Sequence, residues 1–246
     1  MGFYEEFSKY YDIVFPTGQA QLKFIQEASK NTDDKVLDIA CGTGNYAIAL
    51  AERGFQVSAI DLDEAMMKTV EEKARAKGVQ LTTYVGDMRE LGTYLQQRSF
   101  DLAFCIGNSL VHLTKLEEIQ NALHQMHNIL GNEGKLILQI INYDRIMKYS
   151  IDGLPTIEDR EAGVKFVRKY NYDESKRLIY FNTELIVTKN GETRTFTNSV
   201  PLYPLLSHQL IAMLQIAGFK DVKLYGNFME ENYKEESYAT VIIAEK

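Results

Sequence analysis

Hydrophobic and polar residues alternate in a regular order between residues 35 and 142. Short apolar runs rich in β-branched residues are separated by longer runs in which apolar residues recur every three or four positions. Because a continuous apolar run is typical of a strand buried on both faces, this order predicts a parallel sheet covered by helices on each side. The predicted strands span residues 35–40, 56–61, 80–85, 100–106 and 135–142.

Glycines and capping residues indicate where the covering helices begin and end. One helix is expected at 45–53 and another at 64–77, each followed by glycine, which commonly ends a helix. Thr114 and Glu117 have the spacing of a capping box, so they predict the start of a third helix, which Gly131 closes. Further helices are expected at 20–30 and 208–217, and further strands at 219–225 and 237–244.

The character of the chain changes between residues 143 and 206. Residues 163–200 are rich in Thr, Tyr, Val, Ile and Phe with apolar residues at alternate positions, which is typical of antiparallel strands. Asn190-Gly191 predicts a two-residue hairpin turn. The sequence therefore predicts one α/β domain made of residues 1–142 and 207–246, interrupted by an antiparallel β insertion at 143–206. That insertion follows the fifth strand, at the edge where open α/β sheets bind ligands, so we expect it to form a lid or substrate subdomain.

Composition and charge narrow the classes of function. The chain has 246 residues, of which 45% are hydrophobic and 25% charged, as in ordinary globular proteins. A formal net charge of -7 disfavours nucleic acid and anionic membranes as partners. No apolar run approaches the roughly 20 residues of a membrane helix, and no secretory signal is recognisable. Cys41 and Cys105 lack the paired spacing of a metal site, so we expect reduced thiols, no bound metal and a cytoplasmic location.

A glycine-rich turn follows the first predicted strand, in the segment Val36–Gly44. Small residues at such a turn let a ligand approach the backbone, and the next helix begins there with unpaired N–H groups. Gly42 and Gly44 also satisfy the loose dinucleotide fingerprint GxGxxA, with Asp61 near the position that holds ribose hydroxyls. The turn alone therefore leaves a nicotinamide cofactor open.

Acidic residues stand at the ends of three successive predicted strands. Asp38 ends the first, Asp61 the second, and Asp87 follows the third together with Met88. An anion at Asp38 favours a ligand with an ammonium and a sulfonium group, and Asp87 is able to accept from an adenine amino group while Met88 packs on the ring. Three carboxylates suit S-adenosylmethionine better than a pyrophosphate. The alternative is that Asp61 and Asp87 only cap the next elements.

These segments resemble the motifs of class I S-adenosylmethionine-dependent methyltransferases. Val36–Gly44 is similar to the glycine-loop motif of that family, Asp61–Met67 to its second motif, and Gly86–Met88 to its third. The resemblance implies a Rossmann-like doubly wound sheet of about seven strands, the last antiparallel, with the cofactor across the carboxyl ends of strands one to four. The predicted cofactor-binding residues are Tyr11, Asp38, Ala40, Gly42, Gly44, Asp61, Leu62, Met66, Asp87, Met88 and Ile106.

A narrower resemblance is to the glycine and sarcosine N-methyltransferase branch. It is carried by Cys105–Leu113, Asn142–Asp144 and Leu202–Pro204. In that branch the asparagine matching Asn108 contacts the amino-acid substrate, and the aromatic residue matching Tyr203 lines the methyl-transfer pocket.

One residue departs from the pattern of this branch. The branch has an arginine, which pairs with the substrate carboxylate, immediately before Asn-Tyr-Asp, and here that residue is Ile141. Free glycine and sarcosine are therefore expected to be poor acceptors unless Arg168 or another cation reaches the pocket from the insertion. Lys165, Arg168 and Lys169 are expected to lie on a solvated outer face of their strand.

Methyl transfer from a sulfonium is a one-step displacement, so the expected site positions its reactants and excludes water without a covalent nucleophile. Side chains that are able to hydrogen-bond an attacking amine or hydroxyl frame the predicted acceptor pocket. One of them, His112, has a second interpretation as a structural histidine whose hydrogen bonds are satisfied within the protein. The predicted catalytic residues are Tyr11, Asn108, His112, Tyr143 and Tyr203.

The leading hypothesis is a methyltransferase that acts on a small molecule, an amine in preference to a hydroxyl compound. An O-methyltransferase, an NAD-dependent oxidoreductase and a non-catalytic S-adenosylmethionine-binding protein are the alternatives. The sequence leaves a homo-oligomer open.

Overall fold

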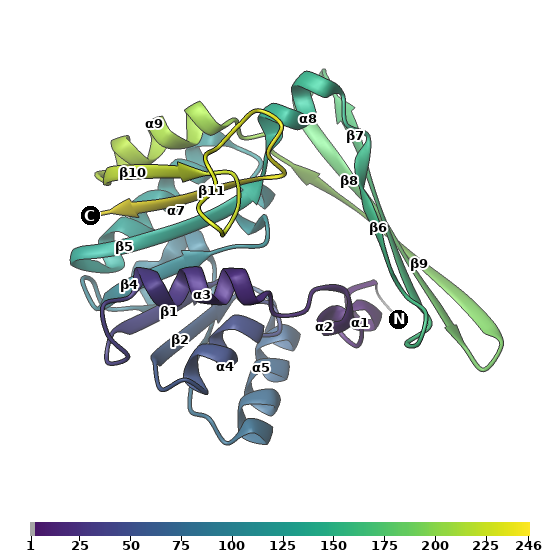
Figure 1. Cartoon of the computed structure of the whole chain (residues 1–246), viewed down its shortest axis with the longest axis horizontal. Helices are drawn as coiled ribbons and strands as arrows, with labels where there is room; N and C mark the ends of the chain where they lie inside the picture. The colour runs from purple at the N-terminus through teal and green to yellow at the C-terminus, as the bar shows by residue number, and fades with distance from the viewer. Residues whose placement is uncertain (1–2) are drawn as a thin grey trace.

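Seven strands form one sheet in the computed structural model, which describes residues 3–246 apart from the side chains of residues 4 and 5. Their order is β10-β11-β5-β4-β1-β2-β3 (Figure 1). The five strands from β5 to β3 run parallel, whereas β11 is antiparallel to both of its neighbours. This arrangement confirms the predicted doubly wound α/β fold. The strands are β1 (Lys35–Ile39), β2 (Gln56–Asp61), β3 (Thr82–Val85), β4 (Phe100–Cys105), β5 (Leu130–Ile141), β10 (Lys220–Tyr225) and β11 (Ala239–Glu245).

Helices cover both faces of this sheet, because successive strand residues point to opposite sides and both sides are apolar. Val36 packs with the helices of one face, and its neighbour Leu37 packs with those of the other. The first face carries α3 (Gln19–Ala28), α4 (Asn45–Ala51) and α5 (Glu64–Lys77). The second carries α6 (Leu91–Tyr94), α7 (Leu116–Ile129) and α9 (Ser207–Ala217). Within residues 3–246, no helix is long and apolar enough to cross a bilayer.

The start and the end of α7 correct two sequence predictions. The Thr114 capping box is wrong, because Lys115 occupies the N-cap position in an extended conformation and forms no side-chain cap. Gly131 does not close the helix either. The chain leaves the helix at Ile129, and Leu130 already pairs with Phe100 as the first residue of β5.

The insertion begins with a helix that the sequence did not predict, α8 (Tyr143–Tyr149), whose N-cap Asn142 accepts a hydrogen bond from the Arg145 amide. Four antiparallel strands follow, and we call them the insert sheet: β6 (Gly153–Asp159), β7 (Val164–Asp173), β8 (Leu178–Lys189) and β9 (Glu192–Leu202). Asn190 and Gly191 join β8 to β9 with φ of 53° and 80°, as a two-residue hairpin turn requires, so this prediction is confirmed.

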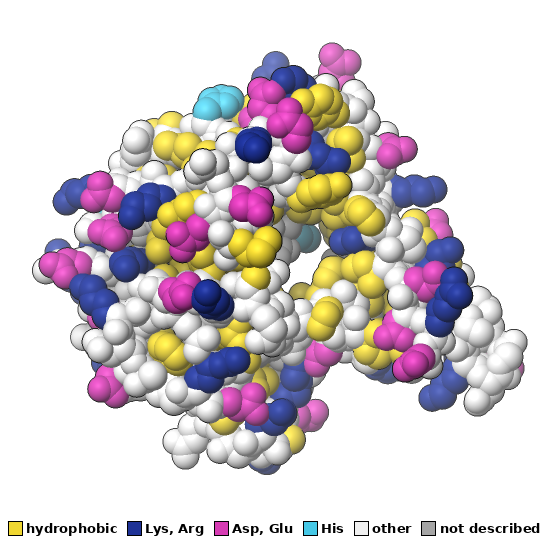
Figure 2. Space-filling view, in the orientation of Figure 1, with side chains coloured by type: hydrophobic (Ala, Val, Ile, Leu, Met, Phe, Trp, Pro, Cys, Tyr) yellow, Lys and Arg dark blue, Asp and Glu magenta, His cyan; other side chains and the backbone are white. Residues whose placement is uncertain are grey.

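Two short helices at the N-terminus, α1 (Phe3–Phe7) and α2 (Tyr11–Val14), lie between the seven-stranded sheet and the insert sheet (Figure 1). The ring of Phe7 stacks on Phe166 of β7 at a centroid distance of 5.0 Å. Figure 2 shows a deep hollow between the two sheets, with hydrophobic side chains on both walls. The insert sheet and the N-terminal helices therefore lie at the same edge of the seven-stranded sheet.

Candidate functional site

The strand order reverses between β1 and β4, and a cavity of about 310 Å³ lies at the carboxyl ends of these two strands. Ligands of open α/β sheets bind at such a switch point. The cavity is lined by Asp38 of β1 and by Ala40 and Cys41 after it. Ile106 and Ser109, which follow β4, line it as well, together with residues of α2 and Gln139 of β5. It therefore brings together four predicted site residues: Tyr11, Asp38, Ala40 and Ile106.

The glycine loop has a backbone that other residues adopt only with strain. Gly42 and Gly44 have φ of 57° and 73°. A Cβ on Gly44 would lie 2.8 Å from Cγ2 of Val70 in α5, and one on Gly42 would lie 3.1 Å from the phenol oxygen of Tyr11. The two glycines therefore keep the loop tight against α5 and leave room between the loop and Tyr11.

Asp38 is 3% exposed, and its Oδ2 has no hydrogen-bond partner among the described residues. Burial raises the pKa of this carboxyl well above its usual range, the nearby Asp61 raises it further, and a hydrogen bond from the Ala47 amide lowers it only in part. A buried carboxyl without a partner costs free energy, which a cationic ligand in the cavity offsets.

Asp61 ties the end of β2 to the glycine loop. Its Oδ2 accepts from the Gly42 amide at 2.8 Å, and its Oδ1 accepts from the Asp63 amide at 3.0 Å. The cap of α5 is Asp63, which accepts from the amides of Ala65 and Met66. Asp61 is therefore not the helix cap that one alternative proposed. Leu62 beside it is 69% exposed.

Asp87, in contrast, does cap the next element. It accepts from the Arg89 amide at the start of a 3-10 turn, η1 (Met88–Glu90), and its Oδ2 lies 2.6 Å from Nη2 of Arg89. The hydrogen bond from Arg89 lowers the pKa of this carboxyl, so it is ionised at neutral pH. Met88 packs partly buried against the core. The contact of both residues with adenine stays a prediction.

The N-terminal helix α2 is fastened over the cavity by a polar cluster that the sequence did not reveal. Asp12 accepts from Thr43 Oγ1 at 2.7 Å, from Asn45 Nδ2 at 2.9 Å and from Lys73 Nζ at 2.7 Å. Partial burial works to raise the pKa of Asp12, but hydrogen bonds from Lys73, Thr43 and Asn45 outweigh it and keep the pKa low. The cluster joins residues far apart in sequence, so no local pattern predicts it.

Asn108 and Tyr143 are bonded to each other at the ends of β4 and β5. The Asn108 Nδ2 donates to the Tyr143 phenol at 3.0 Å, and its Oδ1 accepts from the Ile141 amide at 3.0 Å. Tyr143 is fully buried. Asn108 thus holds the backbone at the position where related enzymes have arginine, and its contact with a substrate stays a prediction.

His112 and Tyr203 lie on the insert side of the same edge. His112 is an exposed residue at the end of the short turn η2 (Ser109–His112), and both interpretations of it, structural histidine and proton acceptor, stay predictions. The protein around the ring lowers its pKa by desolvation, which keeps the imidazole neutral. The Tyr203 amide donates to the Val111 carbonyl at 2.9 Å, which anchors the end of the insertion to η2.

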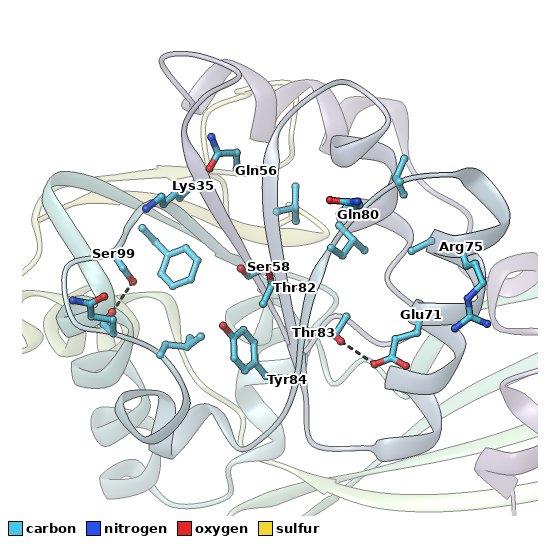
Figure 3. A pocket seen from close by; sticks show the side chains of 17 residues that line it. Lys35, Gln56, Ser58, Glu71, Arg75, Gln80, Thr82, Thr83, Tyr84 and Ser99 are labelled. Carbon is cyan, nitrogen blue, oxygen red and sulfur yellow. Dashed lines mark hydrogen bonds between the residues drawn. The ribbon is translucent and has the colours of Figure 1, made fainter.

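A larger cavity, about 730 Å³, lies elsewhere (Figure 3). It follows the edge strand β3 and reaches the first residues of β1 and β2, Lys35 and Gln56. Figure 3 shows Thr83 of β3 bonded to Glu71 of α5, so part of this surface is already paired. Since it extends to the amino ends of the strands, we assign the candidate site to the smaller cavity.

Comparison with known proteins decides the family. A family model described as a methyltransferase domain matches residues 36–134. A glycine/sarcosine N-methyltransferase from Aphanothece halophytica is 30% identical over 224 residues, which cover 91% of this chain and 80% of that protein. Another from Halorhodospira halochloris is 31% identical over 206 residues, 83% of this chain and 72% of that protein. The chain belongs to the S-adenosylmethionine-dependent methyltransferases.

Solved structures share the fold of this methyltransferase. A Clostridium acetobutylicum S-adenosylmethionine-dependent methyltransferase has a TM-score of 0.83 at 18% identity, with 98% of each chain covered. The amino pentose methyltransferase CalS10 from Micromonospora echinaspora, solved with its cofactor bound, has a TM-score of 0.73 at 20% identity, with 100% of this chain and 98% of that chain covered.

The residues of this methyltransferase fit its cofactor. Asp38 Oδ2 offers a buried acceptor without a partner to a cationic group, and the glycine loop leaves its concave side open under Tyr11. Membership of the family sets aside the oxidoreductase and the non-catalytic binding protein as interpretations.

Proposed function

We propose that this methyltransferase moves a methyl group from S-adenosylmethionine to the nitrogen of a small-molecule amine. The observation that carries the proposal is the cavity at the ends of β1 and β4, which combines the unpartnered Asp38 carboxyl with the uncharged phenol of Tyr11. Burial, together with the charges of Asp61 and Asp38, raises the pKa of that phenol, so it stays protonated. The bound cofactor supplies an electrophilic methyl group, and direct displacement needs no covalent enzyme intermediate.

The donor is held by the ends of the first three strands. Asp38 pairs with its ammonium group and Asp61 accepts from its ribose hydroxyls, while Asp87 and Met88 bind the adenine. The remaining residues that we assign to the donor are Tyr11, Ala40, Gly42, Gly44, Leu62, Met66 and Ile106.

The acceptor is held between that edge and residues 143–206, which act as a lid. Tyr11, Asn108, Tyr143 and Tyr203 orient the attacking nitrogen. His112, whose lowered pKa keeps its imidazole neutral, is able to take the proton that the amine loses. Residues 1–142 and 207–246 then form the cofactor-binding domain.

The names of the related proteins favour nitrogen over oxygen. Both curated relatives described above are glycine/sarcosine N-methyltransferases, and glycine and sarcosine are amines. Their identity to this chain, near 30%, supports the class of acceptor and leaves its identity to experiment.

Two measurements test the proposal. Calorimetric titration should give micromolar binding of S-adenosylmethionine and of its demethylated product, and none of NAD. A transfer assay with a panel of amines, amino acids and phenols should then give methylated amines. Transfer to phenols alone would replace nitrogen by oxygen, and binding of NAD alone would overturn the assignment of the donor site.

A further inference from the structure

Arg168 lies on the inward face of the insert sheet, although the sequence suggested a solvated outer face for it. Side chains of a strand alternate between its two faces, and in β7 the buried residues Phe166 and Tyr170 share a face with Arg168. Lys165 and Lys169 are exposed, as expected. The expectation for Arg168 is therefore wrong, because it lies an even number of residues from the buried aromatic side chains.

This arginine is the middle of a polar row across the insert sheet. Arg168 pairs with Leu154 of β6 and with Thr183 of β8, and Thr183 pairs with Asn198 of β9. Thr183 is 5% exposed. An apolar row that contains Phe166 and Leu185 flanks it on one side, and a row with Tyr170 and Phe181 flanks it on the other. Polar side chains on a buried, otherwise apolar face need partners.

In the described part of the chain, one buried polar atom of Arg168 and one of Tyr170 lack such a partner. The Nε of Arg168 and the phenol oxygen of Tyr170 are buried, and within residues 3–246 neither has a hydrogen-bond partner. One arm of the guanidinium donates to the Pro155 carbonyl, which leaves the Nε–H directed elsewhere. Desolvation lowers the pKa of the Arg168 guanidinium. Burial raises the pKa of the Tyr170 phenol, and the charge of Arg168 opposes that rise, as expected for two groups that lie close together. A half-buried cation whose Nε–H has no partner among the described residues favours an anion.

The pair is connected to the candidate acceptor site. Tyr170 and Tyr143 belong to the same buried cluster, and Tyr143 is bonded to Asn108, which follows β4. The same Asn108 accepts from the amide of Ile141, where the related enzymes have their carboxylate-binding arginine. A cation is thus present near this edge, and it comes from the insert sheet instead of from the end of β5.

We propose that Arg168 and Tyr170 form an oxyanion-binding subsite that holds the acidic group, a carboxylate or a phosphate, of the amine acceptor. The subsite rests on the proposed function for its amine. The Nε–H and an Nη–H of Arg168 donate to the two oxygens of the group, and the Tyr170 hydroxyl donates to one of them. Amino acids with a free carboxylate then become acceptors despite Ile141.

Pairs of acceptors with and without the acidic group test this subsite. Initial rates are measured for glycine against glycinamide, β-alanine against β-alaninamide, and aminoethyl phosphate against ethanolamine. The wild-type enzyme should prefer the acid of at least one pair by about 10- to 100-fold in kcat/KM, because charged hydrogen bonds are strong. Which pair shows the preference distinguishes carboxylate from phosphate. An equal or greater rate for every neutral partner would overturn the subsite.

Variants then locate the preference. Arg168→Gln should reduce it to near unity by raising KM for the acid much more than KM for the neutral partner, and Tyr170→Phe should reduce it about 5-fold. Lys169→Gln removes a neighbouring exposed charge from the same strand and should leave the preference as in wild type. An acid preference that persists in Arg168→Gln would overturn the proposal. Arg168→Lys, which keeps the charge, should restore part of the preference if Arg168→Gln folds poorly.

A binding measurement separates this inference from the proposed function. The Nε–H resonance of Arg168 in ¹⁵N-arginine-labelled protein, assigned by its loss in Arg168→Lys, should shift when N,N-dimethylglycine or aminoethyl phosphate is added to protein saturated with S-adenosylhomocysteine. The amide of dimethylglycine should leave it unmoved. If no amine is methylated, the proposed function fails, yet the shift still supports the anion subsite. No shift with either acid would overturn the subsite even if neutral amines are methylated.

Discussion

The two sheets of this protein bury their strands in different ways. In the seven-stranded sheet β1 is buried from its second residue to its last, because helices cover both faces. In the insert sheet, β9 is exposed along most of its length, and from Phe196 on only alternate residues are partly or fully buried. A strand covered on both faces needs apolar residues at every position, so its composition identifies it. In a strand covered on one face, the function of a residue depends on whether its side chain points inward. A shift of one residue in the assignment moves every side chain to the other face.

Truncation of one aromatic ring in each sheet should separate the stabilities of the two regions. Phe104 is fully buried in β4, so Phe104→Ala should lower the free energy of unfolding by about 3–5 kcal/mol. Phe166→Ala removes the ring that stacks on Phe7, and should speed amide exchange in β7 and β8 while exchange in β4 stays slow. Denaturant unfolding and hydrogen exchange measure the two effects. Equal acceleration in both sheets would mean that they unfold as one unit.

Gly44→Ala should damage the donor site through the close approach of the loop to α5. The new Cβ meets Val70 at 2.8 Å, so we expect a loss of about 2–4 kcal/mol in unfolding free energy together with weaker cofactor binding. Gly78→Ala is the matched control, since Gly78 has a similar φ of 68° and open space around it. It should cost about 1 kcal/mol and leave cofactor affinity unchanged. Equal losses for the two variants would show that only backbone strain matters.

Asp61→Ala should weaken cofactor binding by about 1.5–3 kcal/mol, because it removes a charged acceptor for two ribose hydroxyls. Asp61→Asn should cost less. In the control Asp63→Ala the cap of α5 is lost, so unfolding free energy should fall by about 1 kcal/mol while affinity is kept. Calorimetric titration measures the affinity of each variant for the cofactor. Unchanged affinity in a folded Asp61→Ala protein would refute the ribose role.

Cofactor binding should release a proton from Asp38. Burial holds the pKa of this carboxyl well above its usual range in the free protein, and an ammonium group beside it favours the ionised form. Below the raised pKa, affinity for S-adenosylmethionine should therefore rise with pH, by at most about tenfold per pH unit. Calorimetry in buffers of different ionisation enthalpy measures how many protons are released on binding, and Asp38→Asn should abolish the release. Release that persists in this variant would assign the proton to another group.

The smallest effect concerns the fastening of α2. The Asp12 carboxyl is 48% exposed, so its ion pair with Lys73 should contribute only about 0.5 kcal/mol. Because its pKa is lowered on folding, that contribution is present above the ordinary value near 4 and is lost as pH falls through the lowered value. A double-mutant cycle of Asp12→Asn and Lys73→Met at neutral and acidic pH measures it. Coupling that is independent of pH would exclude the ion pair as its source.

Much of the seven-stranded sheet and its helices could be predicted from sequence, because these elements depend on the local pattern of apolar and polar residues. The strands that carry Asp38 and Asp61 end where the apolar runs predicted, and β1, β2 and β4 bring Asp38, Asp61 and Ile106 to one edge of the sheet. The Thr114 cap failed because a capping box specifies only its first and fourth residues, Thr114 and Glu117, and does not fix the conformation of Lys115.

The missed features depend on contacts between distant parts of the chain. Asp12 meets Thr43 and Lys73, which lie 31 and 61 residues away. Arg168 turns inward because the alternation of β7 is fixed by the burial of Phe166 and Tyr170, and one face becomes the inner one only when the insert sheet packs on the body. Sequence periodicity assigns residues to two faces without saying which face meets a partner.

The position of the N-terminal helices has a consequence for the order of kinetic steps. Tyr11 covers the glycine loop, while Phe7, four residues earlier, is stacked on the insert sheet. Under the proposed function the insert sheet covers the acceptor, so the covers of the two substrates are joined through these helices. A donor that enters beneath them must arrive before they settle, so we expect compulsory-ordered addition with the acceptor second. We likewise expect the demethylated donor to leave last and to limit the rate of turnover when acceptor is plentiful.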